Sequence, residues 1–255
     1  MENELKIVSL SSGSSGNCTY ISDGKNEILI DAGISAKRIC DGLKCLGTDI
    51  KNISALFITH EHCDHVGGLA VLSKKADFDI HITELSAMEY CLKNKPVRPF
   101  SVHPGAFSVK IGEMTVDSFI TPHDSRCCVG YTVRSNGNRF GLATDIGYVS
   151  KEAVDALVGC EKILLEANYD EKMLENGVYS RELKDRVSSH NGHLSNIDCA
   201  AFSKYLAERG TKKIMLVHLS EENNTPELAF GYVSAACRSL DVKISVANRH
   251  TMSEI

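Results

Sequence analysis

Residues 59–65 read THEHCDH, so three of the ten histidines of the chain lie within one short stretch. The stretch follows residues 53–58, an apolar run that predicts a buried strand. A single histidine at a strand end is more often a surface or core residue than a ligand. A cluster of imidazoles beside carboxylates is different, because zinc, manganese and iron prefer these groups. The stretch therefore predicts a metal site where the strand ends.

The composition is that of an ordinary globular protein, with 255 residues, 43% of them hydrophobic and 24% charged. No apolar run approaches the roughly 18 to 20 residues that a membrane helix needs. The N-terminal residues lack the basic and apolar parts of a signal peptide. We therefore expect a cytoplasmic protein with no membrane contact. The net charge of −5 does not indicate a nucleic-acid binder, although a local basic patch is compatible with it.

The ten cysteines include no CxxC pair. We expect most of them to be small buried hydrophobic residues rather than disulfides. Cys63 and the pair Cys127–Cys128 lie beside histidine motifs, so we weighed them as metal ligands and consider that role the less favoured one.

Strand-like and helix-like segments alternate along the chain. Strands are expected at residues 6–10, 18–22, 27–30, 53–59, 107–111, 114–121, 130–135, 139–144, 162–166, 213–218 and 243–246. Helices are expected at residues 35–46, 67–74, 85–93, 151–158, 197–208 and 226–240. Short polar turns join several neighbouring strands, so a purely parallel sheet is disfavoured. The pattern predicts an α/β (α+β) fold with two mixed sheets covered by helices.

His60, His62, Asp64 and His65 form the pattern HxHxDH directly after an apolar strand. This pattern resembles that of the metallo-β-lactamase-fold hydrolases. The resemblance implies one domain over residues 1–255, built as an αββα sandwich with two divalent metal ions at the rim between the sheets. The metal itself stays open among zinc, manganese and iron.

That family needs three further ligands, and the sequence offers a candidate for each after a predicted strand: His123, Asp145 and His218. His81 and His103 compete with His123, but the first lies inside an alternating stretch and the second precedes a Pro-Gly turn. By resemblance, one metal is held by His60, His62 and His123, the other by Asp64, His65 and His218, and Asp145 bridges them. A cysteine commonly replaces the bridging acid in true β-lactamases of this fold.

Two metals roughly 3.5 to 4 Å apart can share a hydroxide that attacks the substrate. Asp64 is the expected catalytic residue, which orients this hydroxide or takes its proton. The metal set alone does not choose among phosphodiesters, thioesters, lactones and β-lactams.

Two stretches bear on the substrate. Residues 11–17, SSGSSGN, follow the first strand, and we expect Ser15 and Asn17 to bind phosphate; a flexible hairpin turn is the competing interpretation. Residues 188–196, SSHNGHLSN, precede a helix. His193 lies directly before the cap and is the preferred catalytic and phosphate-binding residue over His190, with a capped loop bearing surface histidines as the alternative.

The stretches SSGSSGN, THEHCDH, TDIG, LEANYD, GHLSN and LVHLSEENN together resemble the YycJ/WalJ-type branch of the fold over nearly the whole chain. That branch is regarded as 5′-to-3′ exonucleases acting on DNA. The resemblance implies a dinuclear metal-dependent phosphodiesterase that uses a metal-bridging hydroxide on duplex or single-stranded DNA. Cys128 departs from the proline that is usual before Val-Gly-Tyr, which affects loop stiffness more than chemistry.

Basic residues at 181, 184 and 186, and again at 204, 209, 212 and 213, are candidate DNA contacts, although a solvated mixed-charge helix is the favoured interpretation of the first set. The alternative functions are a thioester or lactone hydrolase of the glyoxalase II type, a small cyclic phosphodiesterase, and a non-enzymatic metal sensor or redox scaffold. The glyoxalase relatives are expected to carry a C-terminal helical domain, whereas this chain ends with a helix, a strand and a short tail. Nothing indicates an obligate protein partner.

Overall fold

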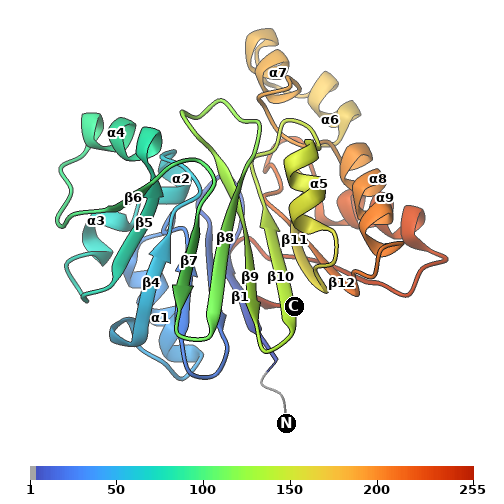
Figure 1. Ribbon diagram of the computed structural model, residues 1–255. Coiled ribbons are helices and arrows are strands. Elements are labelled where there is room, and N and C mark those ends of the chain that lie inside the picture. The colour runs from blue at the N-terminus through green and yellow to red at the C-terminus, as the bar shows by residue number, and fades with distance from the viewer. Residues whose placement is uncertain (1–3) are drawn as a thin grey trace.

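Two seven-stranded sheets face each other in the computed structural model, which describes residues 4–255 (Figure 1). Residues 1–3 lie outside the described residues. They belong to the N-terminal stretch that we do not expect to be a signal peptide. The first sheet has the order β14 (Ser253–Glu254), β1 (Lys6–Ser11), β2 (Cys18–Ser22), β3 (Glu27–Ile30), β4 (Ile53–Phe57), β5 (Asp79–Thr83) and β6 (Ser101–His103). The second has the order β13 (Lys243–Val246), β12 (Lys213–Val217), β11 (Lys162–Glu166), β10 (Asn138–Ala143), β9 (Val129–Ser135), β8 (Met114–Ile120) and β7 (Ser108–Ile111).

Both sheets are mixed. In the first, β1 to β3 pair antiparallel and β3 to β6 pair parallel. In the second, β7 to β10 pair antiparallel and β10 to β13 pair parallel. The carboxyl ends of parallel strands meet at one edge of a sheet, so residues that follow β10, β11 and β12 are brought together there.

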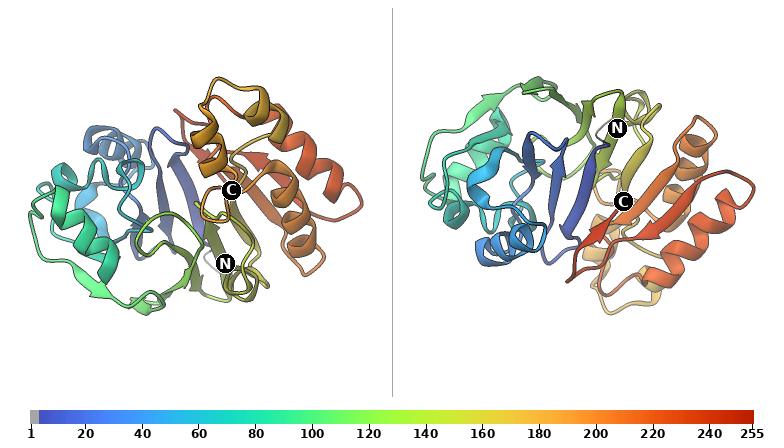
Figure 2. Two further views of the ribbon diagram at one scale, coloured as in Figure 1. Left: turned by 90° about the horizontal axis from the view of Figure 1, so that it is seen from above. Right: turned by 90° about the horizontal axis from the view of Figure 1, so that it is seen from below.

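Helices cover the outer faces of both sheets, as the two end views show (Figure 2). The first sheet is covered by α1 (Ala36–Cys45), α3 (Leu69–Leu72) and α4 (Glu84–Lys93), and the second by α5 (Lys151–Leu157), α8 (Asn196–Ala207) and α9 (Pro226–Cys237). The short helices α6 (Glu171–Asn176) and α7 (Arg181–Val187) lie at the same end of the sandwich as the β8–β9 loop (Figure 1). The predicted αββα arrangement is confirmed.

The largest fully buried side chains, Tyr131, Phe57 and Phe140, belong to the apolar cluster that packs between the two sheets. Removing such a side chain from water contributes roughly 1.5 to 3 kcal/mol. The Tyr131 hydroxyl donates to the Ile58 carbonyl at 2.6 Å, which ties β9 to the residue after β4. The inter-sheet core therefore fixes the two sheet edges against each other.

The elements differ from the predictions mainly at short segments. The helix expected at 67–74 spans only Leu69–Leu72, and the helix expected at 226–240 ends at Cys237. Residues 63–66, expected in a loop, form the short helix α2 (Cys63–Val66). The strands β6 and β14 and the helix α6 were not predicted. Their two to six residues carry too little pattern, and β14 exists because it pairs with β1.

Within residues 4–255, no helix combines the length and apolar character that crossing a membrane requires.

Candidate metal centre

The candidate site lies where strands of both sheets end. His60 follows β4, and Asp145 and His218 follow β10 and β12. Asp145 and His218 have φ angles of 57° and 56°, and Asp31, after β3, has 62°. Among the described residues, the one other non-glycine with positive φ is Asn136, in the β9–β10 turn. Left-handed backbone is costly for such residues and collects at functional sites. The strained positions cluster at this edge and support it as the candidate site.

Three imidazoles form the first group. The ring centroids of His60 and His62 are 4.6 Å apart, and His123 lies 5.1 Å from His60 and 5.2 Å from His62. A nitrogen of each ring lies within 4.8 Å of the others. The Nδ1 of His123 donates to the Gly192 carbonyl at 3.0 Å, which leaves the lone pair of Nε2 free to bind a cation. The geometry suits one cation.

Asp64, His65 and His218 form the second group, with ligand atoms again within 4.8 Å of one another. The Nε2 of His218 lies 3.3 Å from Asp64 Oδ2, and the Nε2 of His65 lies 3.5 Å from the same oxygen. The turn of α2 places Asp64 and His65 side by side, directly after the extended residues that carry His60 and His62.

The buried carboxylate of Asp145 lies between the two groups. Its Oδ2 is 3.2 Å from His65 Nε2, and its Oδ1 is 3.6 Å from His123 Nε2 and 3.7 Å from His218 Nε2. The structure thus brings all seven predicted ligands together, with Asp145 in the central position. Their binding of metal remains a prediction.

Two buried carboxylates that sequence reasoning did not assign stand behind the histidines. Asp31 accepts from His65 Nδ1 at 2.7 Å and from the Thr59 backbone N–H at 2.8 Å. Glu166 Oε1 accepts from His193 Nδ1 at 2.7 Å and from His218 Nδ1 at 3.0 Å. These bonds point the Nε2 atoms of His65 and His218 into the cluster. Asp31 directly follows the apolar strand residues in ILID, and Glu166 ends the strand KILLE. This position at a strand end was the sequence signal from which the two acids could have been predicted.

Burial and charge oppose each other in the cluster. Burial raises the pKa of Asp145, but His218, His65 and His60 outweigh it and hold that pKa well below its ordinary value. Burial raises the pKa of Asp64 in the same way, and its histidine neighbours lower it. For His218, burial lowers the pKa, but Asp145, Asp64 and Glu166 outweigh it and raise it to about 10. The carboxylates are therefore ionised at neutral pH, which favours a bound cation.

The donor set fits divalent metals. His60 Nε2 and Asp145 Oδ2 are buried and have no hydrogen-bond partner among the described residues. Unpartnered buried nitrogen and oxygen atoms are costly unless a ligand satisfies them. Imidazole and carboxylate ligands suit zinc, manganese or iron. None of the groups of potential ligands in the described part of the chain contains a cysteine.

His193 joins the same edge, in the loop before α8. Its side chain is 21% exposed, and its Nδ1 lies 3.7 Å from Asp145 Oδ1. Burial lowers its pKa, but the carboxylate of Glu166 outweighs it and raises that pKa. His193 lines a cleft of about 230 Å³ together with Ser14, Asn168, Arg186 and Ser220.

The serine-rich loop, residues 11–17, is held in place by hydrogen bonds of Asn17. Asn17 is buried: its Oδ1 accepts from the Gly13 N–H at 2.9 Å, and its Nδ2 lies 3.1 Å from His65 Nε2. Ser15 is exposed, and it is the neighbouring Ser14 that lines the cleft. Phosphate binding by Ser15 and Asn17 stays a prediction, and the structure places the Asn17 amide in contact with the His65 ring.

The competing candidates do not join the ligand groups found among residues 4–255. His81 Nδ1 lies 2.9 Å from His103 Nε2, and neither histidine belongs to one of these groups. Cys63 is exposed on α2, and Cys127 is half-buried. Cys128 is buried, with its sulfur 3.6 Å from His60 Nδ1, so it packs behind a ligand. Burial raises the pKa of its thiol well above the ordinary value, which keeps it neutral.

The basic residues of α7 are largely paired within the protein. Arg181 pairs with Asp185 at 2.9 Å, Arg186 contacts Asp124, and Lys184 donates to the Glu175 carbonyl at 2.7 Å. In the second predicted strip, Lys212 pairs with Asp241 at 3.0 Å. These pairs are exposed and weak, so a phosphate can compete for the cations.

Similar proteins are known for most of the chain. The Beta-lactamase superfamily domain matches residues 26–219. The protein called Exodeoxyribonuclease WalJ of Streptococcus pneumoniae is 38% identical over 231 residues, which cover 88% of this chain and 85% of that protein. Exodeoxyribonuclease YycJ of Bacillus anthracis is 35% identical over 222 residues, which cover 86% of this chain and 84% of that protein.

Among solved structures, the metallo-beta-lactamase fold protein YhfI from Bacillus subtilis superposes with a TM-score of 0.73 at 14% identity, covering 98% of this chain and 99% of the other. This likeness establishes the predicted fold.

Proposed function

The chain belongs to the beta-lactamase superfamily, as a YycJ-type metal-dependent hydrolase, and from that premise we propose that it is a DNA exonuclease acting from the 5′ end. The names of the two relatives support a nuclease, and the 5′-to-3′ direction comes from the family resemblance. The matches cover 84% and 85% of the lengths of these two relatives.

One observation carries the proposal: two groups of ligand atoms, each within 4.8 Å, lie on either side of the Asp145 carboxylate. This arrangement fits two divalent cations, with Asp145 between them. Such a pair, when bound, activates water near neutral pH and offsets the charge of a phosphodiester.

The residues of the chain then divide the remaining work. His193, fixed through Nδ1 by Glu166, has Nε2 left to donate to a phosphate or leaving-group oxygen. Asp64 lies at the open side of the cluster, with 17% of its side chain exposed, where it can orient the attacking water. Ser14 and Ser220 line the adjoining cleft and offer hydroxyl donors to phosphate oxygens, while the Asn168 amide beside them donates to the His218 carbonyl at 2.9 Å.

The test uses purified protein supplied with Mn²⁺ or Zn²⁺ and oligonucleotides labelled at the 5′ or the 3′ end. We expect the 5′ label to be released first as mononucleotide, with the 3′-labelled strand shortening stepwise. The Asp64→Ala variant should lose this activity, while Asp41→Ala, an exposed acid on α1, should keep it. Release from the 3′ end would overturn the direction. No cleavage of DNA, together with turnover of a thioester or of a cyclic phosphodiester, would overturn the substrate.

A further inference from the structure

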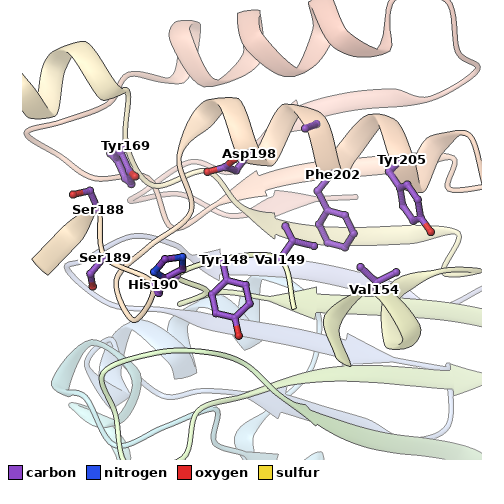
Figure 3. Close-up of a pocket in the computed structure, with 12 residues that line it drawn as sticks. Tyr148, Val149, Val154, Tyr169, Ser188, Ser189, His190, Asp198, Phe202 and Tyr205 are labelled. Atoms are coloured by element: carbon purple, nitrogen blue, oxygen red, sulfur yellow. The ribbon is translucent and has the colours of Figure 1, made fainter. Parts of the chain in front are cut away.

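A second cavity, of about 710 Å³, lies beside the candidate metal centre and takes no part in the chemistry described above. Its walls are the residues after Asp145, the loop before His193 and helix α8. Figure 3 shows Tyr148 and His190 along one side and Asp198, Phe202 and Tyr205 on α8 along the other. The volume falls in the range of about 300 to 1,000 Å³ that is typical of small-molecule sites.

The same two loops serve both places. Asp145 and His193 belong to the metal edge, whereas Tyr148 and His190, three residues away in each loop, face the cavity. The loops are pressed together, since a Cβ on Gly147 would lie 2.1 Å from the His190 carbonyl oxygen. Three residues span at most about 11 Å. A strand whose phosphate lies at the metal centre therefore reaches the cavity within a few nucleotides, at about 3.4 Å per stacked step or more when extended.

The lining selects a flat ring rather than a phosphate. It contains four aromatic side chains, Tyr148, Tyr169, Phe202 and Tyr205, and no lysine or arginine. Its one acid, Asp198, accepts from the Ser195 hydroxyl at 2.9 Å as part of the α8 cap. Tyr148 is 46% exposed, so its ring is accessible to a ligand. Tyr205 is 37% exposed, and the guanidinium of Arg209 lies 3.5 Å from its ring centre and covers one of its faces.

We propose that this cavity binds a nucleobase of the DNA strand, a few nucleotides from the bond that is cleaved. The inference rests on the proposed function and adds the residues that hold the strand away from the metals. Base–aromatic stacking tolerates every base, which suits an enzyme that must move along any sequence.

The test places the fluorescent base 2-aminopurine at successive positions of a single-stranded oligonucleotide whose linkages are phosphorothioates that resist cleavage. The chain contains no tryptophan, so the probe is read without interference. We expect one or two positions at which binding quenches the probe, and we expect Tyr148→Ala to abolish that quenching and to weaken binding about tenfold. Tyr148→Phe, which keeps the ring, should retain both the quenching and the affinity of the unaltered protein.

Phe230→Ala is the matched control, because Phe230 is 45% exposed but lies on α9. It should bind and quench like the unaltered protein. Should Tyr148→Ala melt at a lower temperature, Tyr205→Ala provides the second variant. A titration with free 2-aminopurine deoxynucleotide tests whether the cavity binds a single nucleotide rather than a base within a strand. Tight binding of the free nucleotide at this cavity would overturn the assignment to the strand.

The outcomes distinguish the two proposals. Cleavage of DNA by the unaltered protein, with equal quenching and affinity in Tyr148→Ala and Phe230→Ala, would overturn the cavity assignment alone. Failure of the unaltered protein to bind or cleave any DNA would overturn the proposed function and the inference that rests on it.

Discussion

The two sheets contribute to the site in different ways. The first sheet supplies His60, His62, Asp64 and His65 from one stretch that joins β4 to α2. The second sheet supplies isolated residues, from His123 to His218, each at the end of a different strand or in a separate loop. A local turn encodes the first half, whereas the second half exists only when β10, β11 and β12 pair in register.

The supporting acids repeat this contrast. Asp31, in the first half, holds one ring, that of His65. Glu166, in the second half, holds His193 and His218 and also accepts from the backbone N–H groups of Ile146 and Leu194, at 2.8 and 3.2 Å. One buried acid therefore organises most of the dispersed half.

The largest effect should come from the residue shared by both halves. Asp145→Ala removes the carboxylate between the two ligand groups, and we expect the rate of DNA cleavage to fall at least about a thousandfold, which corresponds to about 4 kcal/mol. Steady-state rates measured with saturating Mn²⁺ check this. A loss below tenfold would show that the two groups do not act together.

The first half depends on close backbone packing, and a methyl group should break it. A Cβ on Gly33 would lie 1.7 Å from the Asp64 carbonyl oxygen, so Gly33→Ala forces the motif to move. We expect a free energy of unfolding lower by about 3 kcal/mol, measured by urea denaturation. Gly231→Ala is the control: its Cβ meets nothing within 4 Å in helix α9, and it should stabilise the protein by about 0.5 to 1 kcal/mol. Equal effects of the two substitutions would contradict this account.

Exchanging the supporting acids should rank the two halves. We expect Glu166→Gln to lower metal affinity about 10- to 100-fold, because removing a partner behind a ligating histidine has this range of effect. Asp31→Asn should cost less, because Asp31 supports one candidate ligand, His65, whereas Glu166 holds His218 and also accepts from the backbone N–H of Ile146, next to Asp145. Calorimetric titration with Mn²⁺ or Zn²⁺ gives the metal affinity of each variant. The reverse order would mean that the local half controls the metals.

The smallest effect is expected far from both halves. Lys37 and Asp41 form an exposed pair at 3.1 Å along α1. Lys37→Ala should change the free energy of unfolding by less than about 0.5 kcal/mol and leave cleavage unaltered. Thermal denaturation beside an activity assay checks it, and a larger change would indicate that α1 has a role that its exposure does not suggest.

The sequence predicted those parts of the molecule that local pattern encodes. HxHxDH after an apolar run identified the first half, and the resemblance then located His123, Asp145 and His218 at strand ends. Glu166 and Asp31 were missed as supporting residues, because their roles depend on which ring lies in front of each acid. The helix α2 and the strand β14 were missed because four and two residues carry no usable period. The aromatic cavity joins residues 147 to 205 and has no sequence motif at all.

The most direct test of the central claim is the number of metal ions held by each chain, measured by native mass spectrometry of protein titrated with Zn²⁺ or Mn²⁺. We predict two ions per chain in the unaltered protein and fewer than two in Asp145→Ala. An unaltered chain that cleaves DNA while it holds at most one ion would contradict the account of two ligand groups joined by a shared carboxylate.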